Sequence, residues 1–191
     1  MDQNLLFSGA VQLLILLLAI SVHESAHAWM ALRCGDDTAA SQGRISLNPA
    51  RHIDPVGTLL VPLLLLLARA PIFGWARPTP VDVRKLREPA RDHMLVTIAG
   101  PASNLLTAAA LAIVLAIAVR VLGEGAREAA FASLVGDLET AAAAPYFPLM
   151  FTLVFGVFLN AFLGVFNLIP VPPLDGGQIV LHLLPPAWAY R

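Results

Sequence analysis

The stretch LLFSGAVQLLILLLAISVHESAHAWMAL, residues 5–32, decides the fold class. It is apolar except for Gln12, two serines and a His/Glu cluster that begins at His23. Roughly 20 apolar residues at 1.5 Å per residue cross the hydrocarbon core of a bilayer, so the stretch predicts a transmembrane helix. Because no basic leader precedes it and it contains His-Glu-x-x-His, we interpret it as a retained helix rather than a secretory signal.

Composition agrees with a membrane protein. Of 191 residues, 58% are hydrophobic and only 13% are charged, which is too little polar surface for a soluble domain of this length. The single cysteine, Cys34, excludes an internal disulfide and a zinc site made of several cysteines. We find neither a glycine-rich phosphate loop nor a basic stripe with stacking aromatics, and therefore expect no nucleic-acid partner.

Three further apolar stretches follow, at residues 56–68, 93–119 and 146–169. The last two are long enough to span the bilayer. The stretch at 56–68 is short and carries Gly57 and Pro62, so we expect a re-entrant or membrane-embedded hairpin there.

The charges of the connecting segments predict the topology. Residues 33–54 and 69–92 are rich in arginine and lysine, whereas residues 120–145 hold two arginines against four carboxylates. By the positive-inside rule the first two segments are cytoplasmic and the third is outside. We therefore expect three full spans with the N-terminus outside, in a multi-pass membrane protein.

Two segments between the spans favour strands. Residues 43–47 (GRISL) alternate polar and apolar side chains, and residues 74–82 (GWARPTPVD) are held extended by their prolines. The predicted fold class is thus an all-α integral membrane protein with small β-strands on the cytoplasmic side, forming one domain over residues 1–191.

The motif His23-Glu24-Ser-Ala-His27 is the strongest chemical signal. Positions i and i+4 lie on one face of a helix, so both imidazoles can bind one Zn²⁺, while Glu24 can take a proton from water. Two histidines and a glutamate are costly inside an apolar helix unless they are paired, coordinated or in a wet cavity. The alternative is a polar cluster that only packs helices together.

A catalytic zinc needs a third protein ligand, and Asp175 is the leading candidate. It follows the last span in NLIPVPPLDGG, residues 167–177, where prolines and glycines free the backbone to bend; its alternative role is a helix N-cap. If residues 56–68 do not cross the membrane, Asp175 and His27 reach the same side. His52 is the reserve candidate.

Asn104 lies in Gly100-Pro-Ala-Ser-Asn104, early in the third apolar stretch. Its amide can donate to a substrate carbonyl or a developing oxyanion, or it can make a helix–helix hydrogen bond. Asn167 leaves the same choice open, with the structural role favoured.

Taken together, these motifs resemble the site-2 protease family of intramembrane zinc metalloproteases, in its compact bacterial branch without a PDZ domain. The resemblance rests on HESAH, GPASN and Asn167 to Gly176, and on the blocks GR…LNP, HIDP and GWARP. It implies one zinc ion per chain, bound by His23, His27 and Asp175. Glu24 would be the general base, and Asn104 would assist substrate or oxyanion binding.

The resemblance also implies a bacterial inner membrane as the location. The implied substrate is a transmembrane helix that is cleaved after it unwinds. The extended residues 74–83 could receive the unwound strand by β-augmentation. Two other classes remain possible on the residues alone: a metal transporter or sensor, and an inactive scaffold that binds transmembrane helices. The sequence does not indicate an oligomeric state.

Overall fold

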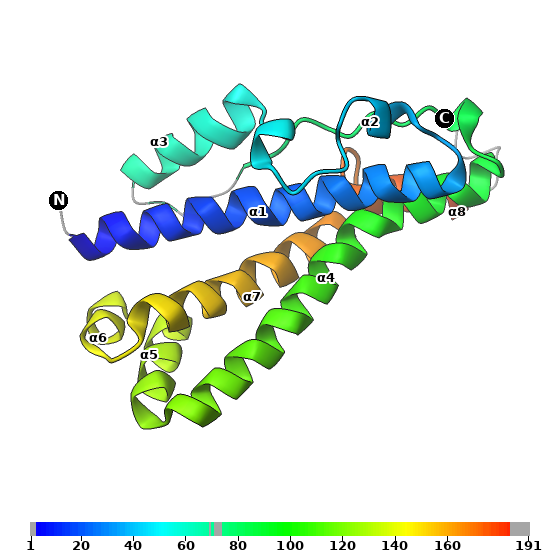
Figure 1. Cartoon of the computed structure of the whole chain (residues 1–191). Helices are drawn as coiled ribbons and strands as arrows, with labels where there is room; N and C mark the ends of the chain where they lie inside the picture. Colours follow the sequence, from blue (N-terminus) through cyan, green and yellow to red (C-terminus); the bar gives the residue numbers. More distant parts are fainter. Residues whose placement is uncertain (1–2, 69, 71–73, 184–191) are drawn as a thin grey trace.

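The computed structural model describes residues 3–68, 70 and 74–183, and three long helices dominate it (Figure 1). They are α1 (Gln3–Cys34), α4 (Pro89–Leu122) and α7 (Phe147–Asn167). Each is long and apolar enough to cross a membrane, which confirms the three predicted spans. The observed helices α1 and α4 extend a few residues beyond the predicted stretches, because polar residues at membrane surfaces continue the backbone hydrogen bonding.

Shorter elements connect the spans. The helices are α2 (Thr38–Ser41), α3 (Val61–Leu67), α5 (Glu124–Val135), α6 (Leu138–Ala143) and α8 (Asp175–Leu183). A π-helical turn, Pro55–Leu60, leads into α3, and 3-10 turns lie at Pro49–Arg51 and Val83–Lys85. Residues 120–145, treated above as a connecting segment, thus contain two helices that pack against the start of α7.

The apolar segment Pro55–Leu67 runs beside the N-terminal half of α1, and the chain then comes back to its starting point (Figure 1). The Trp75 amide donates to the Gly57 carbonyl at 3.2 Å, and the Thr58 hydroxyl donates to the Trp75 carbonyl at 2.7 Å. A Cβ on Gly57 would collide with the Trp75 ring, so glycine permits this approach. Entry and return therefore lie together, as a re-entrant hairpin requires.

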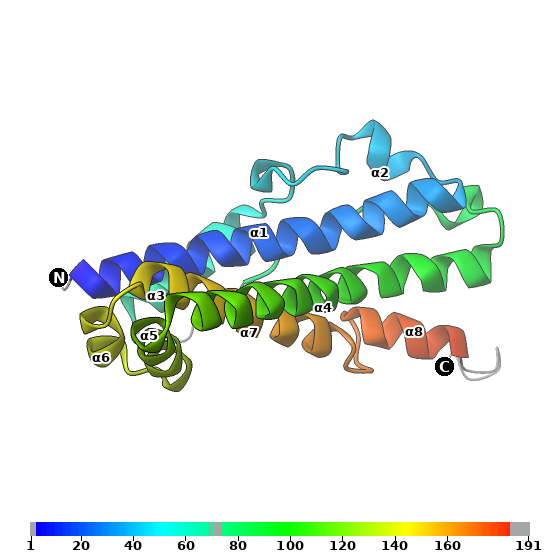
Figure 2. The same ribbon diagram turned by 60° about the horizontal axis from the view of Figure 1, so that its bottom comes forward.

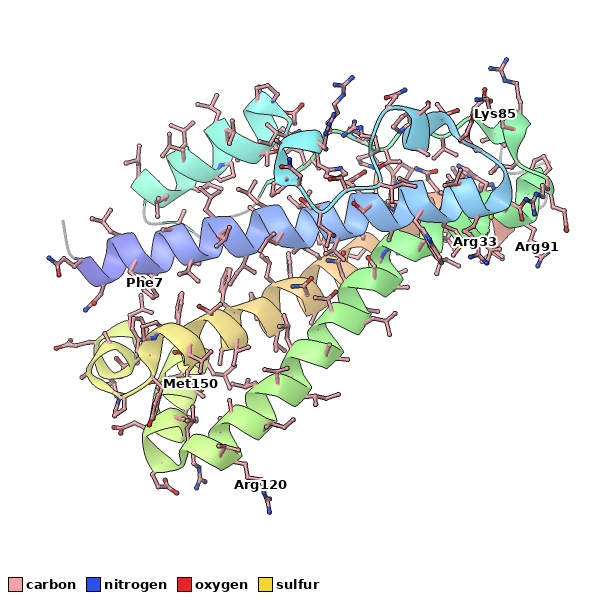
Figure 3. The ribbon with its side chains drawn as sticks, viewed as in Figure 1. Phe7, Arg33, Lys85, Arg91, Arg120 and Met150 are labelled. Atoms are coloured by element: carbon pink, nitrogen blue, oxygen red, sulfur yellow. The ribbon has the colours of Figure 1, made fainter. Side chains whose placement is uncertain are left out.

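The long helices converge at one end and spread apart at the other, where α5 and α6 fill the gap (Figures 1 and 2). At the spread end Phe7 of α1 meets α7, and Met150 is enclosed between α5 and α7 (Figure 3). Leu16 and its neighbours on α1 pack against Leu159 of α7 in the middle of the molecule. At the converging end α8 lies beside the first half of α4 (Figure 2).

The predicted β-strands are wrong: residues 43–47 and 74–82 form no strand, and none occurs elsewhere in the described part of the chain. The segment 74–82 is extended, but its backbone groups bond to side chains and turns rather than to a neighbouring strand. The Arg77 amide, for example, donates to the His52 carbonyl at 3.0 Å, and the Asp82 amide donates to the Asp36 carboxylate at 2.7 Å. Pro78 and Pro80 have no N–H, so a regular ladder cannot form.

Candidate metal centre

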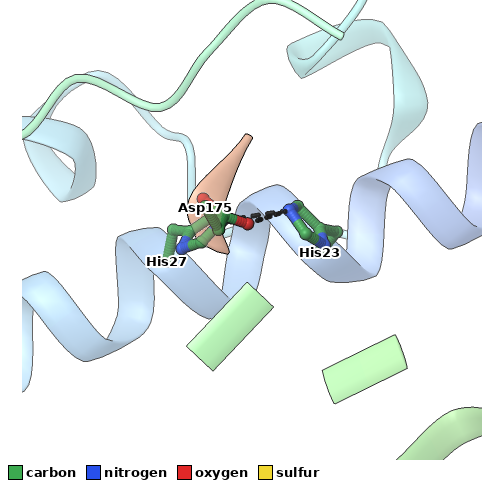
Figure 4. Close-up of side chains that lie close together, drawn as sticks. All are labelled: His23, His27 and Asp175. Carbon is green, nitrogen blue, oxygen red and sulfur yellow. Dashed lines mark hydrogen bonds and ion pairs between the residues drawn. The ribbon is translucent and has the colours of Figure 1, made fainter. Parts of the chain in front are cut away.

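His23 and His27 project from one face of α1 toward Asp175, the first residue of α8 (Figure 4). The Nε2 atoms of the two imidazoles are 3.0 Å apart, and they lie 3.2 Å and 3.4 Å from Asp175 Oδ2. Both histidines are only 8% exposed. Among the described residues, these three form the only cluster of histidine, cysteine or carboxylate side chains able to hold a metal ion.

A tight turn after α7 brings Asp175 to the histidines. The Leu174 amide donates to the Val171 carbonyl at 3.0 Å, and α8 starts at the next residue. Gly176 lies so close to the Leu168 carbonyl that a Cβ there would collide with it. The glycine thus lets the start of α8 fold back on the end of α7, which turns the Asp175 carboxylate inward.

The hydrogen bonds behind the histidines determine which nitrogen carries the proton. His27 Nδ1 lies 2.7 Å from the Val96 carbonyl, which can only accept, so His27 Nδ1 is the protonated nitrogen. Asn104 donates from Nδ2 to the Ala19 carbonyl at 3.1 Å and to Asn160 Oδ1 at 3.0 Å. Its Oδ1 therefore faces His23 Nδ1, at 2.7 Å, and accepts a hydrogen bond from it, so His23 is also protonated at Nδ1.

With both protons on Nδ1, each neutral imidazole presents a bare lone pair at Nε2. These two lone pairs and the buried Oδ2 of Asp175, which has no hydrogen-bond partner of its own, meet in one small space. Such lone pairs repel one another unless a cation, either a proton or a metal ion, lies among them. Ligand atoms about 2.0–2.2 Å from a tetrahedral zinc lie roughly 3.3–3.6 Å apart, close to the distances found here. The residues present thus fit a zinc ion.

The charge of Asp175 suits the same role. Its burial disfavours the ionised form, but the neighbouring His23 and His27 outweigh burial and lower the pKa of the carboxyl to about 2. The group is consequently a carboxylate at neutral pH and can act as an anionic ligand.

Gly100 on α4 allows the third helix to approach the imidazoles. A Cβ at this position would collide with the ring of His27 and would come within 2.8 Å of His23 Cε1. The glycine of the GPASN motif therefore makes room for the metal site. Pro101 follows it inside α4 without ending the helix.

Glu24 points into a cavity of about 200 Å³ beside the three candidate ligands. Thr79 contacts it: the Thr79 amide and hydroxyl lie 2.8 Å and 2.6 Å from Glu24 Oε2. The cavity is also lined by residues from α4, the end of α7, the turn after it and α8, namely His93, Val96, Thr97, Asn167, Pro173 and Gln178. The same cavity thus brings together three imidazoles, two carboxylates and several hydrogen-bonding groups.

The family comparison identifies the class of protein to which this site belongs. Residues 11–187 match Peptidase family M50. The chain belongs to peptidase family M50. This finding confirms the resemblance to the site-2 proteases, and it makes the chain a metalloprotease and a multi-pass membrane protein.

The names of individual relatives agree with this family assignment. The chain is 39% identical over 171 residues to "Putative zinc metalloprotease YwhC" of Bacillus subtilis, covering 90% of this chain and 68% of that protein. It is 30% identical over 170 residues to "Putative zinc metalloprotease Rip2" of Mycolicibacterium smegmatis, covering 88% of this chain and 56% of that relative. The protein named "Putative zinc metalloprotease Rip2" of Mycobacterium tuberculosis is 29% identical over 187 residues, covering 96% of this chain and 62% of that relative. No solved structure matches the chain significantly.

The structure of this M50 chain also shows where the other candidate residues lie. Asn104 is 0% exposed and does not line the cavity, so in this structure it contacts His23 rather than a substrate position. His52, the reserve ligand, binds the Ser46 carbonyl through Nε2 at 2.8 Å and is not part of the three-residue cluster. Asn167 does line the cavity.

Two contributors were missed at the level of sequence. Asn160, an amide in the Phe/Leu-rich helix α7, accepts a hydrogen bond from Asn104, and polar residues within spans are a usable signal for such a role. Thr79 reaches Glu24 across 55 positions in sequence, and nothing local to Thr79 signals that contact.

Proposed function

We propose that this M50 chain is an intramembrane zinc endopeptidase, in which His23, His27 and Asp175 hold one Zn²⁺ and Glu24 is the general base. The proposal rests mainly on the position of His23, His27 and Asp175, whose ligand atoms lie close together, and on Glu24, which lines the cavity beside them. Residues 1–191 would act as a single protease domain.

When bound, Zn²⁺ supplies a Lewis acid that polarises the scissile carbonyl and lowers the pKa of water. Glu24 accepts the proton of the attacking water and later delivers it to the leaving amine. Asn104 and the Val96 carbonyl hold the two imidazoles in the tautomer that turns Nε2 toward the metal. These contacts are made within the protein interior, so the arrangement is set before a substrate arrives.

The substrate class follows from the position of the site. His23 and Glu24 lie within a membrane-spanning helix, so the scissile bond has to enter from the membrane or its surface. Next to the cavity the extended segment presents the Thr79 carbonyl and the Val81 amide, neither of which has a partner among the described residues. An unwound transmembrane segment can pair with these two groups. We therefore propose transmembrane proteins as substrates.

The decisive experiment compares the wild type with Glu24→Gln on a purified single-span test substrate in liposomes. The amide is isosteric with the carboxylate but cannot accept the proton of water. We expect cleavage to fall about 10²- to 10⁴-fold while zinc content, measured by mass spectrometry of the metal, stays at one per chain. Removing zinc with a chelator should abolish wild-type cleavage, and adding zinc back should restore it.

Each rival function predicts a different result. A metal transporter or a scaffold would show no zinc-dependent cleavage in the wild type, and transport or helix binding would survive Glu24→Gln. Equal cleavage rates for the wild type and Glu24→Gln would show that Glu24 is not the general base. The two ligand sets are distinguished by the zinc content of two variants. With the proposed set, His23→Ala should lose the bound zinc ion, whereas His52→Ala should keep one zinc ion per chain.

A further inference from the structure

The carboxylate of Glu24 is held at one oxygen only. The Thr79 amide donates to Oε2 at 2.8 Å, and the Thr79 hydroxyl lies 2.6 Å from the same atom and 3.0 Å from the Glu24 carbonyl. Hydrogen bonds to a charged oxygen are among the stronger ones in proteins. No described residue bonds to Oε1, which is therefore free to meet water in the cavity.

Two donors on Oε2 fix the orientation of a side chain that would otherwise rotate. Glutamate has three side-chain torsions and loses appreciable rotamer entropy when it is ordered. A general base must lie within hydrogen-bond reach of the proton it abstracts, so disorder of Glu24 would lower the fraction of molecules ready to react. The contacts with Thr79 remove that disorder.

Thr79 is itself held firmly, although it lies in an irregular segment. Arg44, only 4% exposed, donates to the carbonyl of Pro78 at 3.2 Å, one residue before Thr79. On the two sides of this pair, the Arg77 amide is bound by the His52 carbonyl and the Asp82 amide by Asp36. The segment is thus anchored at several points by the loop that follows α1, and Thr79 cannot easily move away from Glu24.

We propose that Thr79 is the positioning residue of this protease: it orients Glu24 so that Oε1 faces the reacting water. The inference rests on the proposed function, in which Glu24 is the general base. Thr79 contributes to the rate without taking part in the proton transfer. It holds no metal ligand, so zinc binding should not depend on its hydroxyl.

The test replaces the hydroxyl at constant size. Thr79→Val keeps the amide and the β-branched shape but loses the 2.6 Å contact, whereas Thr79→Ser keeps the hydroxyl. We expect Thr79→Val to lower kcat about 10- to 100-fold, with KM, zinc content and Tm close to those of the wild type. Thr79→Ser should recover most of kcat.

Thr58→Val is the matched control. The Thr58 hydroxyl also bonds to the extended segment, at Trp75, but does not touch Glu24. If Thr79→Val keeps wild-type kcat, or if Thr58→Val lowers kcat as much as Thr79→Val, the proposed role of Thr79 is overturned. The second outcome would mean that general loosening of the segment, rather than the contact with Glu24, controls the rate.

Hydrogen exchange gives a readout that needs no activity. In the wild type the Thr79 amide is protected by Glu24, so Glu24→Ala should speed its exchange, while the Trp75 amide, bound to Gly57, should not change. Unchanged exchange at Thr79 would show that the contact does not form in the membrane and would overturn the inference. An inactive wild type with this protection intact would instead count against the proposed function.

Discussion

At the scale of single residues, the site depends on which atom of each side chain is already occupied. His23 and His27 could each bind a metal through either nitrogen, and the partners of Nδ1 leave only Nε2 free. Asn104 has the same importance for His23 that the Val96 carbonyl has for His27. Its amide is fully committed to protein partners, so we infer that it orients a ligand.

The role of Asn104 can be tested by Asn104→Leu, which has similar volume but no hydrogen bonds. Without an acceptor at Nδ1, His23 loses its fixed tautomer and ring orientation, and zinc affinity should fall roughly 10- to 100-fold. Competition with a zinc chelator measures this affinity in detergent. Asn104 would instead act on the substrate if zinc affinity were unchanged while kcat fell at saturating zinc.

At the scale of elements, the extended segment 74–82 shows how a predicted strand can keep its extended backbone without joining a sheet. Its prolines remove donors, and its remaining groups are bound by α1 and by the loop after it. This leaves the Val81 amide without a partner among the described residues, and Val81 lines the cavity. A backbone amide without a partner beside the cavity can donate a hydrogen bond to a carbonyl of a peptide substrate.

Val81→Pro removes this donor, and Val81→Ala keeps it while shortening the side chain. We expect the proline variant to raise KM or lower kcat/KM by about tenfold, the worth of one hydrogen bond at a site built to use it. Zinc content should be the same in both variants. A proline variant with wild-type kcat/KM would exclude the Val81 amide from substrate binding.

At the scale of the whole molecule, charge is distributed unequally between the two ends. Arg33, Lys85 and Arg91 gather where α1 ends and α4 begins, whereas Arg120 lies at the opposite end, near the acidic α5 (Figure 3). The metal-binding cluster lies nearer the basic end, because α8 packs there against α4. By the positive-inside rule, we propose that this end, and access to the site, is cytoplasmic.

Cysteine labelling tests this orientation. In a Cys34→Ala background, Arg84→Cys should react with a membrane-impermeant reagent only after the inner side is opened. Glu139→Cys, on the acidic end, should react from outside, because both positions are exposed on opposite sides of the proposed bilayer. Labelling of Arg84→Cys from outside, with Glu139→Cys reacting only from inside, would mean that Pro55–Leu67 crosses the membrane or that the orientation is reversed. Labelling of both from one side would mean that α4, the span between them, does not cross.

The sequence by itself determined what depends on local spacing. The three spans follow from uninterrupted apolar length, and the facing of His23 and His27 follows from the four-residue interval on a helix. Asp175 could be chosen because a carboxylate directly after the last span returns to the same side, provided that residues 56–68 do not cross. Its meeting with both histidines is seen only in the folded chain.

Only the tertiary structure decided which long-range partners each polar group takes. Nothing near Thr79 in the sequence points to Glu24, and nothing near Asn104 shows whether its amide faces a ligand or a substrate. The strands failed for the same reason, since alternation and prolines predict an extended backbone but not the presence of a neighbouring strand. Spacing along the chain fixes neighbours within an element, whereas contacts between elements depend on how helices and segments pack in three dimensions.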